Sequence, residues 1–201
     1  MSEEDARKRI VLQFVKDFNL LGHKVTLEQV SKEVRVSKKT IYKYFSSKMD
    51  IYFCIIDEME AQFHEKQKKI YEDETLSVKE KLYHILTLEL DDVVMPDFHK
   101  LINLSKMLDP VKNRLMEAMK GHWLYFKKIF AIAKKDGIVE KNLDADLVVM
   151  MLSSSYEAIF MTGYLQRHNV SYSEAIKRIA SVVLDGCYRK ANENESKQQY
   201  V

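Results

Sequence analysis

Glycine and proline are scarce in this chain, and their scarcity constrains the fold more than any other feature. The sequence has five glycines and two prolines among its 201 residues. Glycine weakens a helix through its backbone freedom, and proline interrupts one through its missing N–H group. Long, uninterrupted helices are therefore expected. No segment has the alternation of apolar and polar residues that is typical of a strand, so the sequence predicts an all-α fold.

The composition is that of an ordinary globular protein, with 46% apolar and 31% charged residues. Its two cysteines, Cys54 and Cys187, have no spacing typical of a metal site or a disulfide framework, which favours a reducing compartment. The N-terminus lacks the apolar core of a signal peptide, and no apolar run is long enough to span a membrane. We therefore expect a cytoplasmic protein with no membrane partner.

Capping patterns predict about nine helices. A Ser, Thr or Asp followed three residues later by Gln, Asp or Glu is typical of a helix start, and Gly after the last apolar residue is typical of a helix end. Thr26, Ser47 and Ser171 show this pattern at expected helix starts, and Ser37 and Asp144 are expected N-caps without the acidic or amide partner. The predicted helices cover 6–21, 27–34, 38–44, 48–71, 77–94, 97–108, 110–136, 145–167 and 172–188, and the polar end of the chain is expected to be disordered.

The segment from Val36 to Ile51 combines a narrow apolar seam with a cationic and aromatic face. Two short helices joined by a brief turn suggest helix-turn-helix geometry here. On the second of them Ile41 and Phe45 lie four residues apart and can face inward. Lys38 and Tyr42 then share another face. Lysines suit DNA phosphates, and Thr and Tyr hydroxyls suit phosphate oxygens or base edges, so this face indicates DNA binding.

The charge distribution points to the same partner. Between Lys24 and Lys48 there are seven basic and two acidic residues, although the whole chain carries a net charge of only +2. A basic patch confined to one end of a chain favours a polyanionic partner.

Residues 26–51, "TLEQVSKEVRVSKKTIYKYFSSKMDI", resemble the helix-turn-helix signature of the tetracycline-repressor (TetR/AcrR) family of bacterial regulators. The most specific part is the pattern T-x-Y-x-Y-F-x-S-K, which begins at Thr40 and ends at Lys48. The dense resemblance covers about residues 10–51, and the layout of nine helices extends it to the rest of the chain.

The resemblance implies an all-helical homodimer with an N-terminal three-helix DNA-binding part and a C-terminal part for ligand binding and dimerisation. We assign residues 1–50 to the first, 51–190 to the second and 191–201 to a disordered tail. The DNA contacts that the resemblance implies are Thr26, Arg35, Ser37, Lys38, Lys39, Thr40, Tyr42, Tyr44 and Lys48.

The sequence departs from the family pattern at three positions. The family often has Gly where Arg35 and Lys39 stand, and usually Ala where Ser31 stands. An Arg in a turn that requires positive φ costs about 1 kcal/mol, and it adds a candidate phosphate contact. A long side chain at Lys39 leaves the operator sequence unpredictable from relatives.

The C-terminal part is rich in methionine and aromatic residues. Most of them are expected to form the core. The sharper hypothesis is a pocket with thioether and aromatic walls, since the family's pocket lies among the helices after the first three. The candidate ligand-binding residues are Met107, Trp123, Phe126, Phe130, Tyr156 and Phe160. An apolar or aromatic ligand is therefore expected, with Glu157 as the best candidate contact for a cationic one.

The last two predicted helices each carry a broad apolar stripe, which favours a homodimer through a four-helix bundle and a palindromic operator. The first stripe contains Leu147, Met150, Met151, Ser154, Ala158, Met161 and Leu165. The second contains Ile176, Ile179, Ala180, Val183, Leu184 and Cys187.

Three functions remain open at this point. The leading hypothesis is a repressor released from double-stranded DNA by a small molecule. The second is a helix-turn-helix regulator controlled by a protein partner or by abundance, and the third is a helical ligand-binding or scaffold protein. No catalytic, cofactor or metal motif is present, so no enzyme activity, cofactor or metal ligand is expected.

Overall fold

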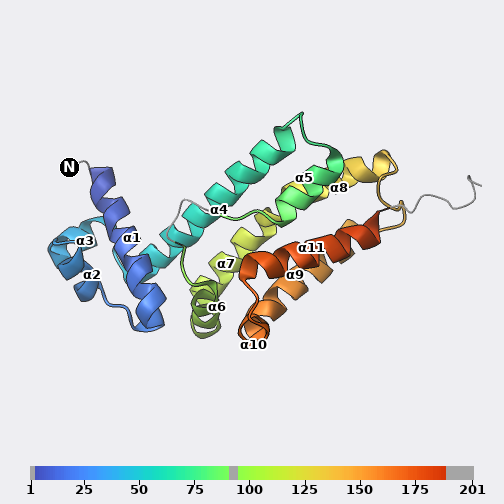
Figure 1. The fold of residues 1–201 in the computed structure, drawn as a ribbon. Helices are drawn as coiled ribbons and strands as arrows, with labels where there is room; N and C mark the ends of the chain where they lie inside the picture. The colour runs from blue at the N-terminus through green and yellow to red at the C-terminus, as the bar shows by residue number, and fades with distance from the viewer. Residues whose placement is uncertain (1–2, 91–94, 189–201) are drawn as a thin grey trace, which may run out of the picture. The chain divides into compact units, whose positions relative to one another are not determined.

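The computed structural model describes residues 3–90 and 95–188. In this part of the chain the fold is all-helical, with eleven α-helices, one short 3-10 helix and an isolated β-bridge between Val139 and Tyr188 (Figure 1). The chain divides into two compact units. The first comprises Met1–Lys68 and Leu88–Leu124, and the second comprises Lys69–Thr87 and Tyr125–Val201. Among the described helices, none combines the length and the hydropathy needed to cross a bilayer.

The first unit contains the N-terminal helices and a second helical pair. Its elements are α1 (Glu3–Leu21), η1 (Gly22–Lys24), α2 (Leu27–Glu33), α3 (Lys38–Tyr44), α4 (Lys48–Glu72, up to Lys68), α6 (Phe98–Met107) and α7 (Asp109–His122). One apolar core runs through all of the α-helices of this unit. Phe14 and Phe18 of α1, Ile41 of α3, Leu101 of α6 and Val111 of α7 are buried in the same cluster.

The predicted helix starts of this unit are confirmed. The side chain of Thr26 accepts a hydrogen bond from the backbone N–H of Gln29, whose own side chain accepts one from the backbone N–H of Thr26. Ser37 caps α3 by accepting from the N–H of Thr40 at 3.0 Å. Ser47 and Asp50 exchange the equivalent bonds at the start of α4, so local side-chain chemistry fixes where these helices begin.

The second unit is built around the last long helix. Its elements are the end of α4, α5 (Val78–Leu86), α8 (Leu124–Lys135, from Tyr125), α9 (Ala145–Met161), α10 (Tyr164–His168) and α11 (Tyr172–Cys187). Helix α11 packs against both α5 and α9, and Figure 1 shows these three helices side by side. Buried Ile176, Ala180 and Leu184 line the inner face of α11.

Several predicted boundaries were wrong. The predicted helix 110–136 is divided at Trp123, which ends α7, and the predicted helix 145–167 is divided at Gly163, whose φ of 65° ends α9. The predicted helix 77–94 ends at Leu86, and residues 91–94 lie outside the described residues. The predicted disordered tail, 191–201, also lies outside them.

The compact units do not divide at residue 50. The core beneath the first three helices continues into α6 and α7, which belong to the same unit. A functional division at residue 50 stays a prediction, since compactness and function need not share a boundary.

Candidate nucleic-acid interface

The turn between α2 and α3 has a defined backbone geometry. Arg35 has a φ of 57°, in the left-handed region that favours glycine. Its N–H donates to the carbonyl of Lys32 at 3.2 Å, and the N–H of Val36 donates to the carbonyl of Ser31 at 3.0 Å. These two bonds form a Schellman motif, which ends α2 and directs the chain into α3. The positive φ expected at Arg35 is confirmed.

Helix α3 is held by its apolar seam and exposes Lys38, Lys39, Tyr42 and Lys43 at the surface. Ile41 is 0% exposed, and Phe45, which follows the helix, is 3% exposed. Tyr42, by contrast, is 54% exposed. Lys38 and Lys39 are also exposed at the first turn. Because the seam fixes the helix, these exposed side chains have a rigid support from which to contact a ligand.

Two lysines are linked through one acidic residue. Glu28 on α2 lies 2.8 Å from Lys38 on α3 and 3.3 Å from Lys32 on its own helix. The hydrogen bond from Lys38 holds the pKa of Glu28 below its usual value, and the same bond raises the pKa of Lys38. Both groups therefore stay charged at neutral pH. Glu28 was not predicted as a site residue, because its pairing with Lys38 depends on the turn geometry.

The predicted hydroxyl contacts take part in local hydrogen bonds. The Oγ of Ser37 and the Oγ1 of Thr40 lie 2.8 Å apart, and either can donate to the other. The Thr26 hydroxyl donates to Gln29 Oε1 at 2.8 Å. Since Ser37 and Thr40 share one donated proton, the second hydroxyl proton is available for a phosphate oxygen.

Lys48 and Tyr44 lie at the edge of this surface. The Nζ of Lys48 donates to the carbonyl of His23 at 2.6 Å and lies 5.7 Å from the ring centroid of Tyr52. Partial burial lowers the pKa of Lys48. An ammonium group has three protons, so this bond leaves donors for a phosphate. Tyr44 is half-buried and packs against the core of the first unit.

The six candidate ligand residues differ in their surroundings. Phe126 and Phe130 are fully buried, with ring centroids 5.5 Å apart, and the Tyr156 hydroxyl donates to the carbonyl of Leu86 at 3.2 Å. Met107 is 62% exposed, and Trp123 is buried. The described side chains do not include that of Phe160. Met107 and Trp123 belong to the first unit and the others to the second, so a common cavity stays a prediction.

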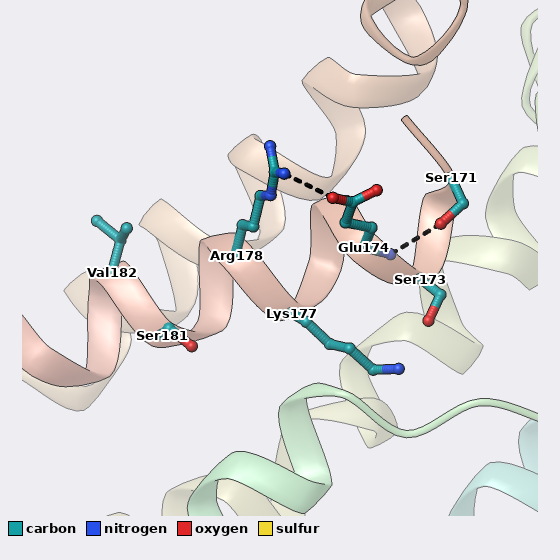
Figure 2. A pocket seen from close by; sticks show the side chains of 7 residues that line it. All are labelled: Ser171, Ser173, Glu174, Lys177, Arg178, Ser181 and Val182. Atoms are coloured by element: carbon teal, nitrogen blue, oxygen red, sulfur yellow. Dashed lines mark hydrogen bonds and ion pairs between the residues drawn. The ribbon is translucent and has the colours of Figure 1, made fainter. Parts of the chain in front are cut away.

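The structure has a hollow elsewhere, on the outer side of α11. Figure 2 shows that all of its lining side chains come from this helix and its N-cap. Arg178 and Glu174, one turn apart on α11, form an ion pair at 2.5 Å beside it. None of the six candidate ligand residues lines it. The lining residues are Ser171, Ser173, Glu174, Lys177, Arg178, Ser181 and Val182.

The two apolar stripes predicted to form the dimer interface differ in solvent exposure. On α9, Leu147, Met150 and Met151 are 48%, 57% and 51% exposed. The α11 stripe is not available to a partner: Ile176, Ala180, Leu184 and Cys187 are buried, and Ile179 and Val183 are half-buried, because α11 packs on both α5 and α9. The α11 stripe is thus wider than one neighbouring helix needs, but α5 of the same chain, and not a twofold mate, covers most of the excess.

Comparison with known proteins identifies the same segment that the geometry singles out. Residues 23–53 match the family described as "Bacterial regulatory proteins, tetR family". The chain is 24% identical over 186 residues to the "Uncharacterized HTH-type transcriptional regulator YvaF" of Bacillus subtilis (strain 168), covering 89% of this chain and 94% of that protein.

Two solved structures show how far the fold is shared. A transcriptional regulator from Saccharomonospora viridis in complex with choline has a TM-score of 0.78 at 16% identity, covering 93% of this chain and 100% of that one. The regulator FadR from Bacillus subtilis in complex with stearoyl-CoA has a TM-score of 0.68 at 19% identity, covering 90% of this chain and 99% of that one.

A capped helix pair with a cationic, hydroxyl-bearing outer face on a helical scaffold defines a helix-turn-helix DNA-binding protein. The chain is a transcriptional regulator of the TetR family, and not an enzyme. The sequence-based resemblance is thereby confirmed.

Proposed function

We propose that this regulator is a homodimeric repressor that binds a palindromic operator and leaves it when a small apolar or aromatic molecule binds. The observation that carries the DNA-binding part is the outer face of α3. It presents Lys38, Lys39 and Tyr42 to solvent while Ile41 anchors the helix. Lysines supply phosphate contacts, and a tyrosine supplies both stacking area and a hydroxyl for base edges.

The proposed DNA contacts fall into two groups according to their position and exposure. Lys38, Lys39 and Tyr42 are exposed on α3, and Arg35 is exposed in the turn before it. Thr26, Ser37, Thr40, Tyr44 and Lys48 lie at helix ends or beside the core, where they suit backbone phosphates better than base edges. We therefore expect sequence discrimination from α3 and general affinity from the flanking residues.

The dimer in this proposal rests on α9. Its exposed Leu147, Met150 and Met151 form an apolar face of the kind that subunit interfaces bury. Helix α11 contributes its outer side, with exposed Val182 among polar residues. Two copies related by a twofold axis would present two α3 helices to the two halves of a palindrome.

Ligand release is the finer part of the proposal. Buried Phe126 and Phe130, with the half-buried Tyr156, supply aromatic surface in the second unit. Helix α4 is continuous from Lys48 to Glu72 and contributes residues to both units. A ligand that displaces the far end would move the end that carries Lys48. A preference of about 1–3 kcal/mol for the displaced state lowers DNA affinity 5–150-fold.

The test uses the ligands seen in the two related structures as first probes. Thermal unfolding is followed with stearoyl-CoA and, separately, with choline, because a ligand at 100-fold its dissociation constant stabilises the fold by about 2.7 kcal/mol. The same additions are made to the complex with DNA from the protein's own promoter region. Stabilisation by stearoyl-CoA together with loss of the DNA complex supports the proposal, whereas the same response to choline alone would indicate a cationic ligand instead. DNA binding that no member of a broad apolar ligand library alters would instead support a regulator without a small-molecule ligand.

A further inference from the structure

The end of α1 and the start of α6 are joined by a dense group of hydrogen bonds. The side-chain amide of Asn19 donates to the carbonyl of Met95 at 2.8 Å. Its Oδ1 accepts from the backbone N–H of Asp97 at 2.5 Å. Both functions of the amide are thus used on the segment that leads into α6, far away in the sequence.

Lys100 completes this group from the side of α6. Its Nζ donates to the carbonyl of Asn19 and, at 3.3 Å, to the carbonyl of Leu20. Carbonyls in the last turn of a helix lack intrahelical partners and carry the negative end of the helix dipole, so a lysine ammonium is well suited to them. The carboxylate of Asp97 caps α6 by accepting from the N–H of Lys100 at 3.0 Å. We call Asn19, Asp97 and Lys100 the α1–α6 clamp.

The clamp lies directly before the DNA-binding helices. The short helix η1 alone separates the end of α1 from the residues that lead into α2, and Lys48 of α4 holds the carbonyl of His23 within it. Leu101 and Leu104 of α6 pack in the same buried cluster as Phe14 and Phe18 of α1. Polar and apolar contacts therefore tie α6 to the same point of the chain.

We propose that Asn19 and Lys100 are positioning residues for DNA binding: the clamp sets the placement of α2 and α3 from outside the helix-turn-helix motif. Operator affinity then depends on α6 as well as on the residues that touch DNA. The proposal requires the DNA binding that the family assignment establishes, and it does not require a small-molecule ligand. Since couplings between distant sites are typically about 5–150-fold in affinity, loss of the clamp should lower operator affinity by at least about fivefold.

The experiment compares clamp variants on two DNA duplexes of equal length. One duplex is selected from random DNA by the wild-type protein, and the other is its scrambled version. The variants are Asn19→Ala, Lys100→Met and the double variant, with Lys112→Met on the exposed side of α7 as matched control. Affinity is measured by fluorescence anisotropy well below each variant's thermal midpoint. Hydrogen exchange follows the amides of residues 19–44.

Both single variants should lose at least about fivefold on the selected duplex, with less than a twofold change on the scrambled one. The double variant should be no weaker than the weaker single variant, because both residues act through one clamp. Exchange should become faster in α2 and α3. Lys112→Met should behave as wild type, and Lys100→Arg should restore most of the affinity because it keeps a cationic donor.

Three results would overturn the proposal. The first is an unchanged preference for the selected duplex while exchange shows that the clamp has opened. The second is a gain of affinity, which would make the clamp a restraint on DNA binding. The third is an equal loss on both duplexes without faster exchange in α2 or α3. A wild-type protein that enriches no sequence would overturn DNA recognition itself, which is a distinguishable failure.

Discussion

Helices α3 and α9 both expose a row of side chains, but the two rows differ in chemistry. On α3 the exposed residues are Lys38, Lys39, Tyr42 and Lys43, and the apolar Ile41 is fully buried. On α9 the exposed residues include Met150 and Met151, each more than half exposed. The α3 surface is stable in water and attracts polyanions, whereas the α9 surface leaves apolar area in water.

The two surfaces therefore differ in whether they need a partner to be stable in water. The face of α3 is complete within one chain, because its seam is buried in the core of the first unit and its lysines are exposed to solvent. The face of α9 gains free energy only when something apolar covers it, at roughly 25 cal/mol per Å². DNA affinity should therefore depend on single side chains of α3, whereas the strength of subunit association should depend on the apolar area of α9.

The largest expected effect is on the free energy of unfolding, and it should distinguish the buried seam of α3 from its exposed face. Ile41→Ala should lower the free energy of unfolding by about 2–5 kcal/mol, because it leaves a cavity where the side chain is fully buried. Tyr42→Ala, next in the sequence, should change it by about 0.5 kcal/mol or less. Urea unfolding of both variants measures the contrast. Equal destabilisation would show that the exposed face of α3 also holds the fold together.

The second prediction concerns α9. Met151→Glu places a charge in the proposed subunit interface and should raise the dimer dissociation constant by at least about 100-fold. Sedimentation equilibrium should then report the 23.7 kDa monomer at micromolar concentration, where wild type is a dimer. Ile132→Glu on α8, another exposed apolar residue, is the matched control. A wild-type monomer, or an unaffected dimer in the Met151 variant, would remove α9 from the interface.

The third prediction distinguishes stability from DNA affinity within one residue. Arg35→Gly should raise the free energy of unfolding by roughly 0.5–1 kcal/mol, because glycine relieves the positive φ of 57°. The same change should weaken DNA binding, since it removes a candidate phosphate contact. Thermal unfolding and anisotropy are measured on one preparation. Affinity that is unchanged or improved would remove Arg35 from the DNA contacts.

The smallest expected effect concerns the acidic residue inside the basic surface. Glu28→Gln removes the charge that pairs with Lys38 and Lys32, so both lysines become free to pair with phosphates. Affinity for random-sequence DNA should rise by about two- to fivefold, and its salt dependence should steepen. Glu33→Gln, an exposed acid on the same helix, is the control for net charge. An equal gain in both variants would assign the effect to overall charge.

Local chemistry explains which features could be predicted from sequence. Capping side chains such as Thr26 and Ser37 act within three residues, so the helix starts follow from the sequence alone. The end of α9 also had a local signal, since Gly163 stands where a helix-ending glycine belongs. By contrast, α5 ends at Leu86 without glycine or proline, and its end was predicted too late.

Long-range contacts explain what could not be predicted. The pairing of Asn19 with Met95 and Asp97, and of Lys100 with the end of α1, joins segments that no local pattern connects. The burial of the α11 stripe likewise depends on α5 packing beside it. The apolar residues proposed for a ligand pocket have the same composition as a core, and for this reason sequence alone does not separate the two.

The most direct test of the account measures how Tyr42 contributes to DNA recognition. Anisotropy titrations compare wild type, Tyr42→Ala and the control Tyr172→Ala, an exposed tyrosine of α11, on the selected and scrambled duplexes. The account predicts that Tyr42→Ala loses about tenfold or more on the selected duplex and much less on the scrambled one, while Tyr172→Ala matches wild type. A Tyr42 variant that is folded and keeps the full wild-type preference would contradict the assignment of α3 as the recognition helix.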